Sequence, residues 1–268
     1  MTRAARNLAM SLVALLVVAS GVAAWYVTRR SPGHPSELTP RDPTLRVSWL
    51  YFYPSRAAAP ARAFVVLFGN DVAFWEPHQD LAWRLAGDGY SVVGVDLKQF
   101  FVTLPSKPPA RDTAFAAAMP NLIQRARHEL NADDLPLVLG GHSLGAEVAL
   151  WIAEHTPPPK LVGVLAINSR STSHLNITLG DLLNTEPKDR WSFSTIDAVR
   201  HLEPGVRVAI VRGGHDPFRS HDSAFAAAGG ARLRRYEIAM AGHALKTMVV
   251  AWPVITRAMR FLVEGTAT

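Results

Sequence analysis

Residues 135–150, LPLVLGGHSLGAEVAL, constrain this chain more than any other stretch. The apolar run 135–139 predicts a buried strand, and residues 146–155 favour a helix with an apolar face. Between them stands Gly-His-Ser-Leu-Gly at 141–145, which fits the G-x-S-x-G pattern of a sharp strand-to-helix turn. The two glycines leave room for a backbone that is strained at Ser143. The stretch therefore predicts an α/β fold in which Ser143 is raised above the end of a sheet.

Composition limits the alternatives. The chain has 268 residues, of which 49% are apolar and 19% charged, enough to bury one large domain or two small ones after a leader. The net charge is +6, but basic blocks interleaved with aromatic residues are missing, which argues against a nucleic-acid partner. The absence of cysteine excludes disulfides, thiolate metal sites and cysteine catalysis.

Residues 1–30 are predicted to be a targeting segment. Arg3 and Arg6 precede an apolar run at 8–27, which is just long enough to span a bilayer as a helix. A small-residue cleavage site is present at 22–24, so the segment is either a signal anchor, which the length of the run favours, or a cleaved signal peptide. Both alternatives place the rest of the chain outside the cytoplasm. Residues 31–44 are rich in proline and serine and are predicted to be a linker.

Residues 45–268 are predicted to form one domain in which strands alternate with helices. Such alternation predicts a mostly parallel central sheet flanked by helices. We expect strands at 47–53, 63–69, 90–96, 135–139, 160–168, 207–211 and 232–238. We expect helices at 77–87, at 112–130 with a break at Pro120, at 146–155 and at 246–264. Residues 169–205 interrupt this rhythm and are too long for an ordinary loop, so they are interpreted as a small cap above the strand ends, or as an irregular surface excursion.

The spacing of histidines and acids predicts the partners of Ser143. A serine hydroxyl needs a base to take its proton and an acid to orient that base, in the chain order serine, acid, histidine. Of the histidines beyond residue 143, only His243 lies in a short loop between the last predicted strand and the final helix. We therefore expect His243 to be the base.

Asp216 is the expected acid, because it closes the strand that precedes this loop. Asp222, a few residues farther on, and Asp181, in the predicted cap, are the alternatives. The pairs His215-Asp216 and His221-Asp222 do not have a recognised ligand spacing, so no metal is predicted.

Two backbone N–H groups are expected to stabilise a developing oxyanion. One belongs to Leu144, directly after the serine. The other should come from the loop after an early central strand, where Asn70 is the candidate and Asp71 the alternative. A carboxylate at Asp71 would repel an oxyanion, and we hypothesise that it instead binds a substrate ammonium group.

Taken together, residues 45–264 resemble the α/β-hydrolase superfamily through Phe-Gly-Asn at 68–70, Gly-His-Ser-Leu-Gly at 141–145, Gly-His-Asp at 214–216 and Gly-His at 242–243. The resemblance implies an eight-stranded, mostly parallel sheet and serine-mediated acyl transfer. The stretches 68–75, 89–101 and 145–148 look most like the bacterial VirJ-type virulence-protein family. Two departures are a Val-Ala-Phe at 72–74, where that family usually has a Gly-Gly pair, and histidine at 142, where it often has tyrosine.

This resemblance implies an exported protein, in the bacterial inner membrane facing the periplasm, or periplasmic if the leader is cleaved. Some relatives hydrolyse aminoacyl-phosphatidylglycerol. The expected function is a cell-envelope serine hydrolase that cleaves a small-molecule or lipid carboxylic ester, with an aminoacyl phospholipid as the candidate substrate. The alternatives are a non-catalytic VirJ-like envelope binding or assembly factor and an acyl transferase. No cofactor is implied, and the sequence leaves the oligomeric state open.

Overall fold

The computed structural model describes residues 33–183, 185–246 and 252–266. The predicted targeting segment at 1–30 lies outside these ranges, as do residues 247–251 of the predicted final helix. Within them, no helix is both long and apolar enough to cross a lipid bilayer.

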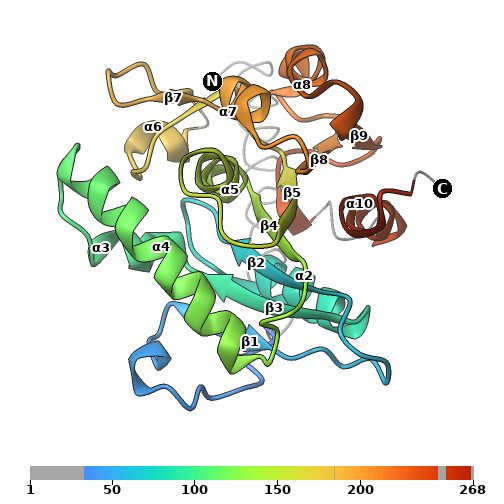
Figure 1. Ribbon diagram of the computed structural model, residues 1–268. Helices are drawn as coiled ribbons and strands as arrows, with labels where there is room; N and C mark the ends of the chain where they lie inside the picture. Colours follow the sequence, from blue (N-terminus) through green and yellow to red (C-terminus); the bar gives the residue numbers. More distant parts are fainter. Residues whose placement is uncertain (1–32, 184, 247–251, 267–268) are drawn as a thin grey trace, which may run out of the picture. The chain divides into compact units, whose positions relative to one another are not determined.

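Seven strands form one sheet in the order β1-β3-β2-β4-β5-β8-β9 (Figure 1). β1 runs antiparallel to β3, and every other neighbouring pair is parallel, so the predicted mostly parallel sheet is confirmed. The described residues hold seven strands in this sheet, not the eight that the resemblance implied. The bounds are β1 Leu50–Tyr53, β2 Ala63–Phe68, β3 Tyr90–Val95, β4 Leu137–His142, β5 Leu161–Ile167, β8 Arg207–Gly213 and β9 Leu233–Ile238.

Helices cover both faces of the sheet (Figure 1). In β2 every residue is buried, and successive side chains enter opposite cores, Val65 one and Val66 the other. Burial on both faces explains why this strand is a continuous apolar run. The core with Val65 is closed by α2 (Glu76–Gly87) and α10 (Trp252–Glu264). The opposite core is closed by α3 (Leu97–Val102), α4 (Ala110–Glu129), α5 (Leu144–His155), α7 (Thr195–His201) and α8 (Asp222–Gly229).

The prediction of a break at Pro120 is wrong, because α4 runs without interruption through that residue. A proline inside a helix removes one backbone donor and crowds the preceding turn. Here Phe115, Met119 and Ile123 form one buried stripe on both sides of Pro120. Packing of such a stripe supplies most of a helix's stability in a folded protein, which accounts for the helix continuing.

Residues 34–44 of the predicted linker pack against the domain. The hydroxyl of Tyr53 donates to the carbonyl oxygen of His34 at 2.8 Å. The backbone N–H groups of Arg41 and Asp42 donate to the buried carboxylate of Glu129 at 2.8 and 2.9 Å. The compact unit therefore begins at His34, ahead of the predicted boundary at residue 45.

The interval 169–205 contains β6 (Thr172–Ser173), α6 (Leu179–Leu182), β7 (Phe193–Ser194) and α7. β6 and β7 form a separate two-stranded sheet. α7 packs against α5 and so belongs to the helix layer. The remainder, residues 171–194, is called the roof segment below. The N–H of Thr195 donates to the carbonyl oxygen of Ser171 at 3.0 Å, so the two ends of the roof segment meet.

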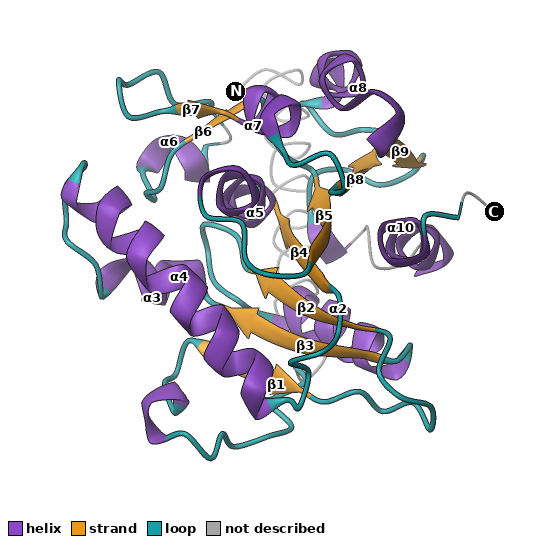
Figure 2. Ribbon diagram, viewed as in Figure 1, coloured by secondary structure: helices purple, strands orange, loops and turns teal. Residues whose placement is uncertain are grey.

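The parallel strands point the same way, as the arrowheads of β2 and β3 toward the side of α3 and α6 illustrate (Figure 2). Segments that follow β2, β3, β4, β5, β8 and β9 therefore share one side of the sheet, called the carboxyl edge below. Ligand sites of open α/β sheets lie at this edge.

Candidate active site

Ser143 lies at the carboxyl edge, between β4 and α5, with φ of 53° and ψ of −123°. A positive φ is unfavourable for a residue with a side chain and marks a strained turn. The residues two positions before and after Ser143 must be glycine. A Cβ on Gly141 would stand 2.3 Å from the carbonyl carbon of Gly145, and one on Gly145 would stand 2.3 Å from the carbonyl oxygen of Phe68. The strand-to-helix turn predicted from the sequence is confirmed.

The structure brings together the three residues expected to form a catalytic triad. Nε2 of His243 lies 3.1 Å from Oγ of Ser143, and its Nδ1 lies 3.1 Å from Oδ2 of Asp216. The other oxygen of Asp216 accepts the N–H of Phe218 at 2.7 Å. Burial would raise the pKa of Asp216, but the hydrogen bond from His243 and the charge of Arg212 outweigh it and lower that pKa. Asp216 is therefore an ionised acceptor for the imidazole.

The two alternative acids have other partners. Asp222 accepts a hydrogen bond from Nε of Arg212 at 2.9 Å, and this guanidinium lies 3.5 Å from Asp216. Asp222 thus positions a countercharge for Asp216 and does not reach His243. Asp181 lies in the roof segment. The carboxylates of the two His-Asp pairs, at 216 and 222, thus both face the guanidinium of Arg212.

The expected oxyanion donors flank Ser143. Asn70 follows β2 in a tight turn, where Oδ1 of its side chain accepts the N–H groups of Val72 and Ala73 at 3.1 and 3.3 Å. Within the described residues, the N–H groups of Asn70 and Leu144 donate to no other backbone or side-chain acceptor. Both are therefore available to a substrate oxygen.

Asp71 lies beside these donors and is 8% exposed. Among the described residues, no other residue donates a hydrogen bond to its carboxylate, and burial raises its pKa. It lines a cavity of about 280 Å³. The residues around this cavity are Asn70, Asp71, Val72, Trp75, His78, His142, Ser143, Asp181, His243, Ala244, Leu245 and Lys246.

Sequence reasoning missed two residues that hold the loop of His243. The carbonyl oxygen of His243 accepts Nε2–H of His142 at 2.7 Å and Nδ2–H of Asn168 at 2.8 Å. Asn168, with φ of 52°, also accepts the N–H of Gly213 through its Oδ1 at 3.0 Å. These bonds tie the ends of β4, β5 and β8 to the base. The sign that the sequence offered for His142 was its place inside the G-x-S-x-G pattern, directly before Ser143.

His142 is buried next to His78 of α2, with ring centroids 5.7 Å apart. Burial lowers the pKa of His142 to about 3 and holds that of His78 well below its ordinary value. Both imidazoles are therefore neutral near pH 7. Because a carbonyl oxygen only accepts, His142 must carry its proton on Nε2.

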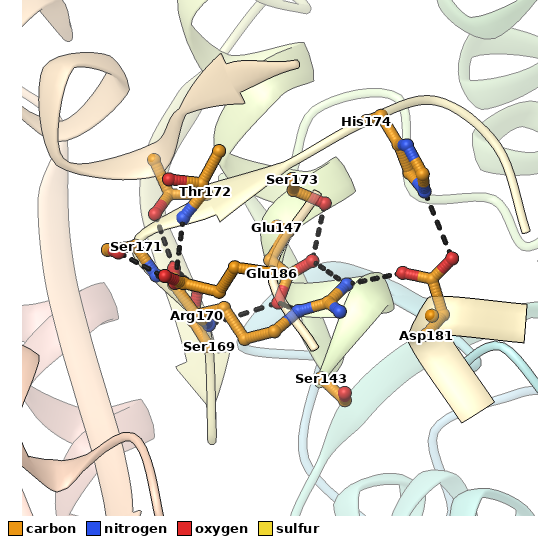
Figure 3. A network of polar contacts seen from close by, with 12 residues as sticks. Ser143, Glu147, Ser169, Arg170, Ser171, Thr172, Ser173, His174, Asp181 and Glu186 are labelled. Atoms are coloured by element: carbon orange, nitrogen blue, oxygen red, sulfur yellow. Dashed lines mark hydrogen bonds and ion pairs between the residues drawn. The ribbon is translucent and has the colours of Figure 1, made fainter. Parts of the chain in front are cut away.

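The roof segment is fastened by buried charges (Figure 3). Arg170 is 2% exposed and makes three hydrogen bonds of 2.8–3.0 Å to the carboxylate of Glu147, one of them through its backbone N–H. The same guanidinium donates to Asp181 at 2.9 Å. Asp181 also lies 3.0 Å from Nε2 of His174 and accepts the N–H of Thr178 at 2.7 Å. Glu147 belongs to α5, the helix that begins after Ser143, so one arginine joins the roof segment to that helix.

Comparison with known proteins places this geometry in a fold family. No protein-family model and no curated protein matched the chain. Among solved structures, a Klebsiella pneumoniae protein assigned as a dienelactone hydrolase matches 81% of this chain and 92% of its own, with a TM-score of 0.59 and 17% identity. Esterase 2 of Thermogutta terrifontis matches 88% and 97%, with a TM-score of 0.58 and 18% identity.

A puromycin-hydrolyzing peptidase of Mycobacterium tuberculosis matches 80% of this chain and 37% of its own, with a TM-score of 0.55 and 16% identity. At these identities the likeness concerns the fold. The chain has the α/β-hydrolase fold.

Proposed function

We propose that this protein is a serine hydrolase that cleaves carboxylic esters through an acyl-enzyme. The observation that carries the proposal is the hydrogen-bonded line from Ser143 through His243 to Asp216, at 3.1 Å for each step. This line stands at a strained turn that opens into a cavity. The arrangement meets the geometric requirements for a nucleophile, a base and an orienting acid.

Acylation begins when Oγ of Ser143 attacks the ester carbonyl carbon and Nε2 of His243 takes the hydroxyl proton. Asp216 remains ionised, accepts Nδ1–H and stabilises the imidazolium that forms. The N–H groups of Asn70 and Leu144 receive the oxyanion of the tetrahedral intermediate. One such donor typically contributes about a hundredfold to a thousandfold in rate. The imidazolium then protonates the departing alkoxide, which leaves an acyl ester on Ser143.

Deacylation reverses these roles with water. His243 takes a proton from a water molecule, whose oxygen attacks the acyl carbon, and then returns the proton to Oγ of Ser143. The products are a carboxylic acid and an alcohol, and the protein is regenerated.

The substrate proposal is an aminoacyl ester of a phospholipid. Asp71 supports it, because a carboxylate that lines the cavity without a donor from another described residue is suited to an ammonium group. The guanidinium of Arg170 donates hydrogen bonds to Glu147 and Asp181 and none to Asp71. The net charge of +6 favours approach to anionic lipid. A place in the bacterial cell envelope, through residues 1–30, and a relation to the VirJ-type family are part of this proposal.

Labelling of the full-length protein with a fluorophosphonate probe tests the catalytic proposal. We expect labelling of the wild type that is lost in both Ser143→Ala and His243→Ala, because the probe reacts only with an activated serine. Failure of the folded wild type to react would favour the non-catalytic envelope factor.

Release of the amino acid from an aminoacyl phospholipid tests the substrate. Asp71→Asn is expected to raise KM for that ester about tenfold or more while changing KM for an uncharged ester little, since only the ammonium loses its partner. Equal effects on both esters would contradict the role of Asp71.

A further inference from the structure

The large apolar side chains that the described residues expose all lie at the carboxyl edge. They are Val72, Val102, Leu179, Leu183 and Met240, with exposed fractions from 46% to 85%. Val72 follows β2, Val102 ends α3 after β3, the two leucines are in the roof segment after β5, and Met240 follows β9. Single exposed apolar residues are ordinary, but their confinement to one side of a sheet marks a contact surface.

The roof segment shows how this exposure arises. Leu179 and Leu183 are four residues apart around α6, so they share a face, and they are 71% and 66% exposed. Asp181, between them, points toward Arg170 and His174 and is buried (Figure 3). The short helix is therefore anchored through Asp181, and Leu179 and Leu183 face the exterior.

Exposed cations lie in the same segments as Val102 and the two roof leucines, or next to them in the chain. Lys98 in α3, Lys107 before α4, and Lys188 and Arg190 in the roof segment are all exposed. In the part of the chain that the structure describes, none of the four forms an ion pair within 4.0 Å. The exposed carboxylate among them is Asp189, which already lies 3.4 Å from Nδ1 of His174. The exposed charge of α3, of the segment before α4 and of the roof segment is therefore positive on balance.

We propose that the carboxyl edge docks directly onto a lipid surface with anionic head groups. The exposed apolar side chains enter the boundary between head groups and acyl chains, and the four cations contact the negative head groups. Val72 lines the cavity of Ser143, so the docked surface includes the entrance of the candidate site. Docking requires no reaction, and the proposal holds or fails independently of catalysis.

Depth-dependent fluorescence of the full-length protein in vesicles tests this docking. The chain contains no cysteine, so Leu179→Cys, Leu183→Cys and Met240→Cys each give one site for an environment-sensitive dye. Ala58→Cys is the matched control, because Ala58 is exposed in the loop before β2, at the opposite edge of the sheet. Vesicles contain phosphatidylglycerol or phosphatidylcholine alone, and spin-labelled lipids act as quenchers.

With phosphatidylglycerol we expect a blue shift and quenching at positions 179, 183 and 240, with position 58 unaffected. Lys188→Glu with Arg190→Glu, or 0.5 M salt, should reduce the bound fraction of the dye signal about tenfold. Equal signals at the two edges, or no signal at positions 179, 183 and 240, would overturn the proposal. A blue shift without vesicles that grows with protein concentration would instead indicate contact between copies of this chain.

Discussion

The floor and the roof of the candidate site are built by different means. In the floor, which is the β4-α5 turn with the loops of Asp216 and His243, the positions of Ser143 and His243 depend on uncharged contacts. These are the positive φ at Ser143, the glycines without room for a Cβ, and the hydrogen bonds to the carbonyl oxygen of His243. The roof segment is held by buried side-chain charges that converge on Arg170. Steric constraints fix atoms to fractions of an ångström, which catalysis needs, whereas an ion network fixes a segment that only shapes access.

The largest expected effect separates the two candidate acids of the floor. Asp216→Asn should lower kcat/KM on an ester by about ten thousandfold, because the amide disturbs the tautomer of His243. Asp222→Asn is the matched control and should cost far less, since Asp222 acts through Arg212. Ester hydrolysis rates of the two variants decide, and equal losses would contradict the assignment.

The second largest effect is expected from removing the charge of Arg170, which holds the roof segment. Arg170→Met leaves Glu147 and Asp181 buried without their partner, and should lower the free energy of unfolding by about 3–5 kcal/mol. Arg200→Met, which breaks the exposed pair with Asp197, should cost less than about 1 kcal/mol. Urea titrations measure both. A small effect at Arg170 would mean that the roof does not depend on its ion network.

A substitution outside the triad can weaken the hydrogen bonds that position His243. His142→Phe removes one of the two donors to the carbonyl oxygen of His243 and should lower kcat by roughly tenfold to a hundredfold, with KM changed less. His155→Phe is the same substitution on α5 at a partly exposed site and should leave kcat unchanged. Steady-state kinetics on one ester compare them, and an unaltered kcat in His142→Phe would show that Asn168 alone suffices.

The smallest expected effect is on stability in mild acid. The pKa of His142 in the folded protein is about 3, below its ordinary value of 6.5. Between pH 6.5 and pH 3, the unfolded chain therefore binds a proton at His142 that the folded protein does not bind. Between these values stability falls with falling pH, by up to about 1.4 kcal/mol per unit for this residue. Denaturation midpoints from pH 7 to pH 5 should decline more steeply in the wild type than in His142→Phe. Parallel slopes would mean that His142 binds protons equally in the folded and unfolded states, so that its pKa is not lowered by folding.

The contrast between floor and roof also explains what the sequence could predict. Ser143, Asp216 and His243 follow from chain order and from the strand ends, because parallel strands bring their carboxyl ends together. The hydrogen bonds from His142 and Asn168 to the carbonyl oxygen of His243 depend on the register between strands that are distant in the sequence. Local sequence patterns do not contain this information. One feature of the sequence indicated the ion network, a glutamate at position 147 within the otherwise apolar run 144–153. Its partner Arg170, 23 residues away, could not be paired with it from spacing.

The hydrogen bond between Ser171 and Thr195 affects how the sequence of this protein can change in evolution. Insertions and deletions are tolerated where the ends of a segment are already close, because the flanking structure need not move. The two ends of the roof segment meet at one hydrogen bond, and its buried carboxylate Asp181 accepts a hydrogen bond from the guanidinium of Arg170. The part of the proposed lipid contact that Leu179 and Leu183 supply can thus diverge between descendants by exchange of about two dozen residues, while the triad of Ser143, His243 and Asp216 stays unchanged.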